Sequence, residues 1–356
     1  MTMRIGEKSI GAGFPTYFIA DIAANHDGSL ERAKSLIHLA HLAGADAAKF
    51  QHFKASSIVS EHGFAVLGPN TSHQTAWVDS VVDVYDAASI PDDWTIELYK
   101  ECKKIGITFL STPYNEQAVD ELNPLVPAYK IGSGDIDWLE HIEHIAQKGK
   151  PVLLAIGAAD MAEVRAAVEA VTKWNPDVAI LQCNTNYTGN ETNVDHINLQ
   201  VLTTLHELWP DAVLGLSDHT AAPEPVVGAV ALGARIIERH FTDDTTRSGP
   251  DHGFALDPTM WADMVGRVRT LERALGSSHK TIETNEQDAV VVQRRCLRFR
   301  RDLPSGHTLC REDIDVLRPA TPGGLSPADL DSVLGATLAQ SVLDGREITR
   351  ADIDSH

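Results

Sequence analysis

Charged and imidazole side chains stand near the carboxyl ends of short apolar runs in the first three-quarters of this sequence. Two lysines, Lys49 and Lys130, and two histidines, His219 and His240, occur in such places. Burying these groups costs free energy unless a partner or a ligand compensates them. The same run ends carry further polar residues, namely Asp21, Gln51, Thr112, Ser133, Asp135, Asn184, Tyr187 and Ser217. We therefore expect these side chains to gather at one binding site.

The two lysines allow two chemistries. A desolvated lysine amine can form a Schiff base with a keto substrate, as in class I aldolases. Two lysines with hydroxyls nearby, here Thr112, Ser133 and Ser217, can instead hold a phosphorylated carboxylic acid through charge-assisted hydrogen bonds. Either lysine alone could also pair with a carboxylate in a stabilising layer of the core. The residues by themselves leave these interpretations open.

His219 and His240 end neighbouring apolar runs and are placed to share a divalent cation. Imidazole ligands with few carboxylates and no cysteine suit Mn²⁺, Zn²⁺ or a related ion. Two histidines leave coordination positions for water and a substrate oxygen, which is typical of a catalytic Lewis-acid site. A single histidine of this kind is more often a hydrogen-bonded packing residue, so the expectation depends on both.

Eight short apolar runs, each followed by a segment of helical periodicity, must position these side chains. The runs are residues 17–23, 47–52, 108–113, 128–134, 151–157, 178–184, 212–219 and 235–241. Strand–helix alternation predicts a parallel sheet, and eight units predict a closed (β/α)8 TIM barrel with its site at the carboxyl ends of the strands. A doubly wound open sheet is the alternative, but no GxGxxG loop follows the first run.

Changes in composition and periodicity along the sequence predict a barrel over residues 1–275, a polar linker over 276–293 and a further domain over 294–356. The first part of the last segment, residues 294–327, is basic and rich in turns, so we expect a small, mostly β domain. No internal repeat is expected beyond the barrel units. Residues 53–92 are too long for a simple strand–helix loop and would lie at the site as a lid, a substrate wall or a neutral insertion.

Composition argues against several classes of function. The formal net charge of −20 disfavours nucleic acid as a partner because its phosphates would be repelled, although an anionic substrate can still bind in a locally basic pocket. The four cysteines lie far apart and predict neither a disulfide framework nor a zinc ribbon. No apolar run has membrane-spanning length, and no signal-peptide core is present near the N-terminus. These features predict a soluble, cytoplasmic protein without membrane contact.

Several motifs, in order, resemble the sialic acid synthase (NeuB) family. They are "FIADIAANHDGSLERAKSLIHLAHLAGADAAKFQ", "STPY", "YKIGSGDI", "GLSDHT", "IERHFT" and "GPDHGFALDP". The segment "RRCLRFRRDLPSGHTLCREDIDVLRP" is similar to the antifreeze-like (SAF) domain of those enzymes. The resemblance implies a transferase that condenses phosphoenolpyruvate (PEP) with an open-chain N-acylated amino sugar such as N-acetylmannosamine, with C–O cleavage and release of phosphate.

The resemblance also implies roles for individual residues. The residues expected to hold PEP are Lys49, Thr112, Lys130, Ser133, Asn184 and Ser217. The residues expected to contact the sugar are Asp21, Gln51, Tyr187, Asp251 and Arg318. His219 and His240 would ligate Mn²⁺, with Mg²⁺ or Co²⁺ as alternatives, and Asp135 is the candidate acid/base. The expected catalytic set is therefore Asp21, Lys130, Asp135, His219 and His240. Arg318 matches an arginine that enters the partner's site, which implies a domain-swapped homodimer.

Some positions depart from the family pattern. The first strand reads "ADIA" where the family carries a glutamate, so the carboxylate of Asp21 is one methylene shorter and is expected to alter sugar selection. The fifth strand reads "AIG" in place of "STG", so Ala155 and Ile156 lack two hydroxyls. The alternatives are PEP condensation with a different aldose, a class I aldolase, and a barrel that binds without catalysing.

Overall fold

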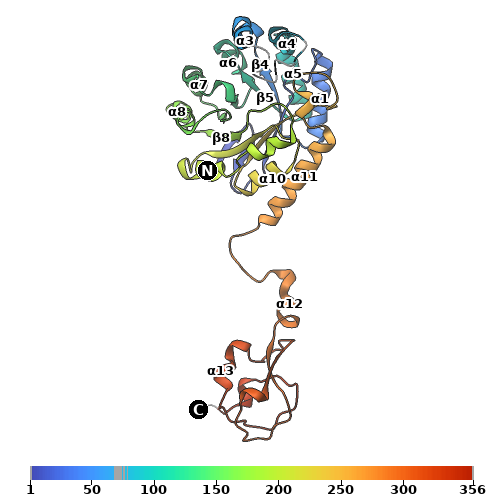
Figure 1. Cartoon of the computed structure of the whole chain (residues 1–356), viewed down its shortest axis with the longest axis vertical. Helices are drawn as coiled ribbons and strands as arrows, with labels where there is room; N and C mark the ends of the chain where they lie inside the picture. Colours follow the sequence, from blue (N-terminus) through green and yellow to red (C-terminus); the bar gives the residue numbers. More distant parts are fainter. Residues whose placement is uncertain (1, 68–73, 75–76, 78, 355–356) are drawn as a thin grey trace. The chain divides into compact units, whose positions relative to one another are not determined.

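The computed structural model describes residues 2–67, 74, 77 and 79–354. These residues form two compact units, one within residues 1–276 and the other within residues 277–356. Figure 1 follows the chain through both units by colour. None of the helices described combines the length and the apolarity that a membrane span requires.

The first unit is a TIM barrel. Its strands, in chain order, are β3 (Tyr17–Asp21), β4 (Ala47–His52), β5 (Thr108–Pro113), β6 (Tyr129–Ile131), β7 (Val152–Ala155), β8 (Val178–Cys183), β9 (Val213–Asp218) and β10 (Ile236–His240). They are hydrogen-bonded in the order β5-β4-β3-β10-β9-β8-β7-β6, and every pair is parallel. Because β5 and β6 at the two ends of this order also lie side by side, the predicted barrel is confirmed.

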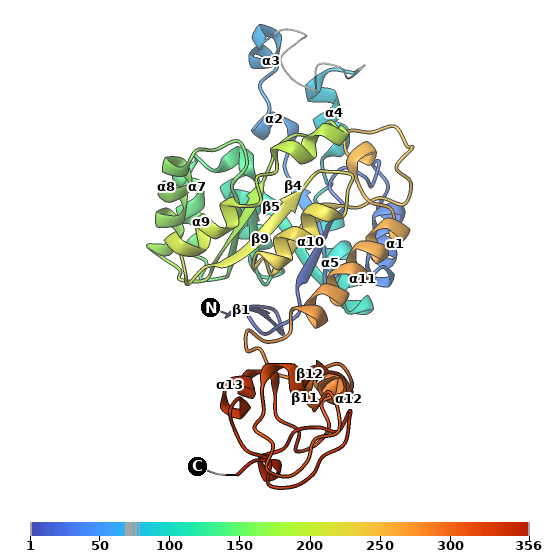
Figure 2. The ribbon, with the colours of Figure 1, turned by 60° about the horizontal axis from the view of Figure 1, so that its bottom comes forward.

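Amphipathic helices surround the barrel, as Figures 1 and 2 show. They are α1 (Leu30–Leu42), α5 (Trp94–Ile105), α6 (Glu116–Leu122), α7 (Leu139–Ala146), α8 (Met161–Thr172), α9 (Val201–Leu208), α10 (Glu224–Ala231) and α11 (Pro258–Leu275). Their apolar faces pack against outward-pointing strand residues such as Phe18 and Phe50. N-cap side chains define where the helices begin, since the Ser29 hydroxyl accepts a hydrogen bond from the backbone N–H of Arg32.

Side-chain alternation along the strands gives the barrel interior distinct layers. An apolar layer near the amino-terminal ends of the strands contains Ile19, Leu110, Leu181 and Ile236. Farther along the strands, the inward positions carry the buried residues Asp21, Lys49, Thr112, Lys130, Ala155, Cys183, Ser217 and Glu238. The predicted site residues of the strands therefore belong to one polar layer, which lies on an apolar one.

An N-terminal hairpin packs against the apolar layer, a feature that was not predicted. Strands β1 (Thr2–Ile5) and β2 (Lys8–Gly11) pair antiparallel. The buried side chains of Met3 and Ile5 join the same cluster as the inward strand residues. Their alternation with exposed Arg4 is too short to predict a strand by itself. The hairpin thus covers the amino-terminal end of the barrel, opposite the predicted site.

The long segment after β4 adds helices α2 (Ala55–Ile58), α3 (Glu61–Leu67) and α4 (Val81–Ala88). Figure 2 shows α3 and α4 projecting from one end of the barrel. Part of the predicted 53–92 insertion, namely residues 68–73, 75, 76 and 78, lies outside the described residues. The part that is described belongs to the barrel unit.

The second unit is built from short elements. They are α12 (Gln287–Val292), β11 (Cys296–Phe299), β12 (Ile314–Leu317) and α13 (Leu330–Val333), with single-turn 3₁₀ helices between them. Strands β11 and β12 pair antiparallel, and isolated bridges supplement them. Apolar side chains such as Leu297, Phe299 and Ile348 form its own buried core. The unit has the small core and the turn-rich chain that its sequence predicts.

The second unit also contains an internal repeat, so the expectation of none was wrong. Residues 303–314 and 342–353 each contain a glycine of positive φ and end in a 3₁₀ turn whose acidic residue, Asp313 or Asp352, completes a capping box. The first residues of the two arms exchange backbone hydrogen bonds of 3.1 and 2.9 Å. Only a Gly, an Arg, an Asp and an Ile recur at equivalent positions, which is why the sequence pattern did not indicate the repeat.

We predict that Asp313→Asn destabilises the second unit by roughly 2 kcal/mol near neutral pH, because the substitution removes a buried carboxylate that accepts hydrogen bonds from charged side chains. Asp313 is buried and accepts hydrogen bonds from Arg301, His307 and the backbone of Cys310. Burial alone would raise the pKa of Asp313, but these donors hold it well below its usual range. The stabilisation is therefore complete above about pH 4 and is lost only as the pH falls further.

Backbone hydrogen exchange of residues 303–314 in the full-length chain measures this effect. The control is Asp315→Asn, which removes the same charge from a partly exposed position on β12. We expect faster exchange only in Asp313→Asn. Equal protection in the two variants would contradict the capping role of Asp313.

Candidate active site

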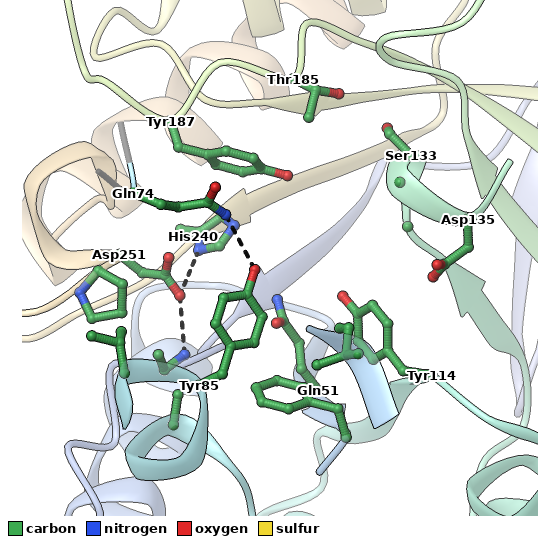
Figure 3. Close-up of a pocket in the computed structure, with 18 of the residues that line it drawn as sticks. Gln51, Gln74, Tyr85, Tyr114, Ser133, Asp135, Thr185, Tyr187, His240 and Asp251 are labelled. Atoms are coloured by element: carbon green, nitrogen blue, oxygen red, sulfur yellow. Dashed lines mark hydrogen bonds and ion pairs between the residues drawn. The ribbon is translucent and has the colours of Figure 1, made fainter. Parts of the chain in front are cut away.

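A cavity of about 370 Å³ opens at the carboxyl ends of the barrel strands (Figure 3). The strand ends and the loops after them contribute Gln51, Tyr114, Ser133, Asp135, Thr185, Tyr187, His240 and Asp251. The long segment after β4 contributes Phe53, Ile58, Gln74, Trp77, Val84, Tyr85 and Ala88. Of the three interpretations of residues 53–92, the described part of this insertion agrees with a wall of the cavity.

A buried ion pair lies next to the cavity-lining residue Gln51. Lys49 Nζ is 2.7 Å from Asp21 Oδ2, and both side chains are only 2% exposed. Lys49 Nζ also donates to Thr112 Oγ1 at 3.3 Å, and Gln51 Nε2 donates to the same Asp21 oxygen at 3.2 Å. Burial alone would lower the pKa of Lys49, but the carboxylates of Asp21 and Glu238 raise it. Lys49 is therefore a fixed positive charge within the polar layer.

A second buried pair joins Lys130 and Glu238. Lys130 Nζ lies 3.6 Å from Glu238 Oε1 and donates to the Ile131 carbonyl oxygen at 2.9 Å. Ser217 Oγ donates to the same Glu238 oxygen at 3.2 Å, while Glu238 Oε2 has no hydrogen-bond partner among the described residues. Burial lowers the pKa of Lys130, and the charge of Glu238 opposes this shift. Sequence reasoning assigned Glu238 no role, although its inward position two residues before His240 could have indicated one.

The imidazoles of His219 and His240 are neighbours, with ring centroids 5.4 Å apart. His219 Nδ1 lies 3.1 Å from the Asn184 carbonyl oxygen and 3.9 Å from Cys183 Sγ. The ring of Tyr187 packs edge-on against His219 with centroids 4.5 Å apart. Contacts from β8 and the loop after it therefore fix the orientation of His219.

His240 lies between two carboxylates. Its Nε2 is 3.7 Å from Asp21 Oδ2 and its Nδ1 is 3.8 Å from Asp251 Oδ2. Burial, together with the charges of His219 and Lys49, lowers the pKa of His240 well below its usual range, which favours the neutral imidazole that can bind a metal. Its Nδ1 has no hydrogen-bond partner among the described residues.

The two imidazoles and the unpaired Nδ1 of His240 fit a divalent cation with open coordination positions. In the described ranges of the chain, no three His, Cys, Asp or Glu side chains are close enough to enclose such an ion. A cation held by His219 and His240 would therefore complete its coordination with water or a substrate oxygen.

Asp135 lies across the cavity from His240 and Asp251 (Figure 3). It ends the 3₁₀ helix Ser133–Asp135, which follows β6 directly. Burial and the charge of Asp137 raise the pKa of Asp135 to about 6, although Lys130 opposes the shift. A carboxyl group that titrates near neutrality beside an open cavity is suited to proton transfer.

The described outer wall of the cavity is aromatic and includes neither lysine nor arginine. Phe53 packs against Tyr85 and Tyr114, with centroid separations of 5.5 and 5.7 Å, and Gln74 Nε2 donates to the Tyr85 hydroxyl at 3.3 Å. Residues 55–99 contain neither Lys nor Arg, and neither lines the cavity within the described part of the chain. Sequence reasoning missed Tyr85 and Tyr114, although Tyr114 ends the quoted strand motif "STPY".

Most of the predicted site residues lie in or directly beside the cavity. Those that line it are Gln51, Ser133, Asp135, Tyr187, His240 and Asp251. Those buried in the polar layer or its extension are Asp21, Lys49, Thr112, Lys130, Ser217 and His219. The Asn184 side chain instead donates to the His196 carbonyl oxygen at 3.4 Å. Arg318 belongs to the second unit and precedes the cis peptide to Pro319. The roles implied for these residues, PEP or sugar contact included, stay predictions.

The two residues that replace the family's hydroxyl pair at the end of β7, Ala155 and Ile156, differ in orientation. Ile156 belongs to the buried layer between the strands and the helices, so its loss of a hydroxyl does not alter the barrel interior. Ala155 alternates with the inward residue Leu153 and therefore faces the polar layer. Of the two departures, only Ala155 removes a hydrogen-bonding group from the site side.

Comparison with known proteins agrees with this architecture. Residues 36–280 match the NeuB family and residues 294–354 match the SAF domain. An N,N'-diacetyllegionaminic acid synthase of Legionella pneumophila is 32% identical over 357 residues, which is 98% of each chain. The N-acetylneuraminate-9-phosphate synthase of Homo sapiens is 32% identical over 348 residues, covering 98% of this chain and 95% of that protein.

A solved structure gives the same relationship. The N-acetylneuraminic acid (sialic acid) synthetase from Leptospira borgpetersenii, crystallised in complex with citrate, superposes with a TM-score of 0.72 and 28% identity, covering 82% of this chain and 95% of that one. With a family match over most of the barrel and relatives matched along nearly the whole length, this chain is an enzyme of the NeuB family that carries a C-terminal SAF domain.

Proposed function

We propose that this enzyme condenses PEP with the open-chain aldehyde of an N-acylated amino sugar, forming a nonulosonic acid and releasing phosphate. The observation that carries the proposal is the position of two buried lysines, Lys49 and Lys130, beneath an aromatic cavity whose described lining includes neither lysine nor arginine. The lysines suit a small, highly charged anion, and the cavity suits an uncharged sugar. The names of the related synthases support this assignment.

In the proposed reaction, C3 of PEP attacks the aldehyde carbon and forms the new C–C bond. The aldehyde oxygen takes up a proton and becomes a hydroxyl, and the oxocarbenium ion left at C2 captures water and releases a proton. The resulting tetrahedral intermediate breaks its C2–O bond to phosphate and becomes the 2-keto acid. Lys49 and Lys130, assisted by the hydroxyls of Thr112, Ser133 and Ser217, hold PEP during these steps. Without PEP, Asp21 and Glu238 balance the lysine charges.

The proposed acceptor is not phosphorylated. The acidic groups that line the described cavity are the carboxyl groups of Asp135 and Asp251, and the imidazole of His240 beside them is neutral. Carboxylates would repel a sugar phosphate. The apolar side chains of Ile58 and Val84 favour acyl methyl groups and deoxygenated carbons, since burial of apolar surface is favourable. The proposed acceptor thus resembles that implied by the name of the legionaminic acid synthase more than that of the 9-phosphate synthase.

His219 and His240 are proposed to hold a divalent cation, with Mn²⁺ first and Mg²⁺ or Co²⁺ as alternatives. Such an ion supplies Lewis-acid polarisation of the aldehyde oxygen when bound. Gln51, Tyr187 and Asp251 would orient the sugar hydroxyls beside it. Two further proposals follow from the resemblance and the composition: a domain-swapped homodimer in which Arg318 completes the partner's site, and a cytoplasmic location.

We predict that phosphate is released from PEP in the presence of Mn²⁺ and an unphosphorylated N-acylated amino sugar. The panel compares N-acetylmannosamine, a 2,4-diacetamido-2,4,6-trideoxyhexose, N-acetylmannosamine 6-phosphate and aldoses without an acyl group. We expect kcat/KM to be at least about tenfold lower for the 6-phosphate, since about 1.4 kcal/mol of repulsion has this effect. Mass analysis of the product identifies the acceptor.

Absence of phosphate release with every aldehyde of the panel would overturn the proposed function. A preference for the 6-phosphate would overturn only the acceptor assignment. Preference for an aldose without an acyl group would favour the alternative of a different sugar pathway.

We predict that EDTA and His219→Ala each lower kcat/KM by at least about a hundredfold, because the polarisation of the aldehyde is lost. Added Mn²⁺ should restore the EDTA-treated wild type but not the variant. Elemental analysis provides a second readout, since His219→Ala should also retain less Mn²⁺. The matched control is His206→Ala, on the exposed face of α9. Full activity in EDTA together with borohydride trapping of Lys130 by a keto substrate would favour the class I aldolase.

We predict that Asp135→Asn lowers kcat by about 10²–10⁴, as expected for loss of a base that accepts the proton of the attacking water. In the wild type, kcat/KM should decrease as the pH falls below about 6, the pKa of Asp135. Asp137→Asn is the control: it removes a neighbouring charge that raises this pKa, so the acidic limb should move to lower pH with activity retained.

Thermal unfolding gives an independent check on Asp135. Its folded-state pKa of about 6 lies above the unfolded value of about 3.9. The ionised carboxylate therefore disfavours folding at a pH above both values. Asp135→Asn should unfold at a higher temperature than the wild type near pH 8, and the difference should disappear below about pH 4. An unchanged pH profile in Asp137→Asn and no stabilisation in Asp135→Asn would contradict the assigned pKa.

A further inference from the structure

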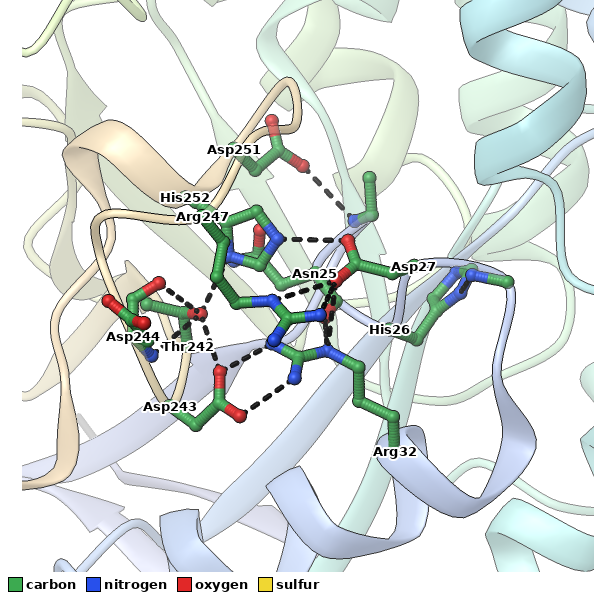
Figure 4. Close-up of polar contacts among 12 residues, drawn as sticks. Asn25, His26, Asp27, Arg32, Thr242, Asp243, Asp244, Arg247, Asp251 and His252 are labelled. Atoms are coloured by element: carbon green, nitrogen blue, oxygen red, sulfur yellow. Dashed lines mark hydrogen bonds and ion pairs between the residues drawn. The ribbon is translucent and has the colours of Figure 1, made fainter.

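A network of charged and polar side chains joins the loop after β3 to the loop after β10 (Figure 4). We call it the mouth network, and it consists of Asp27, Arg32, Thr242, Asp243, Arg247 and His252. None of these residues lines the cavity in the described part of the chain. The network nevertheless adjoins Asp251, which does.

Asp27 is the centre of the mouth network. Its Oδ2 accepts hydrogen bonds from Arg247 Nε at 3.0 Å and from Arg247 Nη2 at 2.8 Å. The same oxygen lies 3.1 Å from Arg32 Nε, and Oδ1 lies 2.9 Å from His252 Nε2. Arg32 also pairs with Asp243 through both of its terminal nitrogens. The Asp27 carboxylate thus contacts two guanidinium groups and orients an imidazole.

Both ring nitrogens of His252 are engaged, although its side chain is fully buried. Nε2 faces Asp27, and Nδ1 lies 2.7 Å from Thr242 Oγ1. Gly249, three residues earlier, leaves no room for a side chain because a Cβ there would lie 2.7 Å from the His252 ring. The loop from Thr242 to His252 is therefore packed around this imidazole.

The neighbour of His252 in the chain is the cavity residue Asp251. Its Oδ2 accepts a hydrogen bond from the backbone N–H of Ala24 at 3.1 Å and lies 3.8 Å from His240 Nδ1. Ala24 belongs to the same loop as Asp27, and it lines the cavity. The position of Asp251 therefore depends on how the two loops are held together.

We propose that Asp27 is a positioning residue that sets the place of Asp251 at the acceptor side of the cavity. It acts through His252 and Arg247, which fix the loop after β10 against the loop after β3. The inference rests on the proposed function, because it assigns Asp251 to the acceptor sugar. PEP is assigned to Lys49 and Lys130, which the mouth network does not contact, so Asp27 should affect acceptor binding and leave PEP binding unchanged.

The test compares Asp27→Asn with Asp244→Asn in the full-length protein. Both variants remove one negative charge at the mouth, but the Asp244 side chain accepts hydrogen bonds from Thr246 of its own turn and from no other described residue. Backbone hydrogen exchange of residues 242–252, measured without substrates, reports loop attachment. Steady-state kinetics with the acceptor found in the panel measure the acceptor KM and kcat. Calorimetric titration with PEP alone measures the PEP Kd.

For Asp27→Asn we expect exchange of residues 242–252 to rise at least about tenfold and the acceptor KM to rise at least about tenfold, with kcat and the PEP Kd within about threefold of wild type, as for loss of uniform binding. Arg247→Lys keeps the charge but not the paired hydrogen bonds, and it should give the same pattern with smaller changes. Asp244→Asn should match the wild type.

Unchanged exchange in Asp27→Asn would overturn the inference. Faster exchange with an unchanged acceptor KM would also overturn it, because the loop would then not position Asp251. A weaker PEP Kd together with a lower unfolding temperature would show a general structural role instead. If the wild type itself consumes no PEP with any aldose, the proposed function and the acceptor part of this inference fall together, while the exchange experiment still decides whether Asp27 attaches the loop.

Discussion

The barrel depends on keeping two ammonium groups charged in a buried layer. Lys49 and Lys130 are each 2% exposed, and such burial is unfavourable unless carboxylates compensate it. Asp21 and Glu238 provide this compensation from strands that neighbour each other in the sheet, β3 and β10. The apolar layer of Ile19, Leu110, Leu181 and Ile236 lies on the amino-terminal side of these pairs, and the cavity opens on their carboxyl-terminal side.

The alternation of side chains along each strand, with a period of two residues, explains how much of the polar layer could be predicted. Inward and outward residues alternate, so the run ends indicated which polar side chains share the interior, and all eight predicted strands are present. The contacts that each side chain makes within the site could not be predicted from this alternation. The Asn184 amide donates to the carbonyl of His196, twelve residues further along the chain. Glu238 is held by contacts with residues of two other strands, Lys130 and Ser217.

Other features depend on contacts that are weak in the sequence or distant along it. The N-terminal hairpin is defined by Met3 and Ile5 inserting into the barrel's apolar layer, and two short alternating segments cannot indicate that partner. The repeat in the second unit is carried by backbone turns around Asp313 and Asp352, which tolerate different side chains between them. The aromatic wall from the segment after β4 depends on tertiary packing of Phe53 and Tyr85.

The adjacency of β3 and β10 has a consequence for how the enzyme is made. Asp27 and His252 are 225 positions apart, and the strands before them pair directly. In a chain that emerges from the ribosome in order, β3 and Asp27 are synthesised long before β10 and His252. The contacts that hold Asp251 beside the cavity are therefore absent from a nascent chain that has not yet reached residue 252, although Lys49 and Lys130 are already present in it.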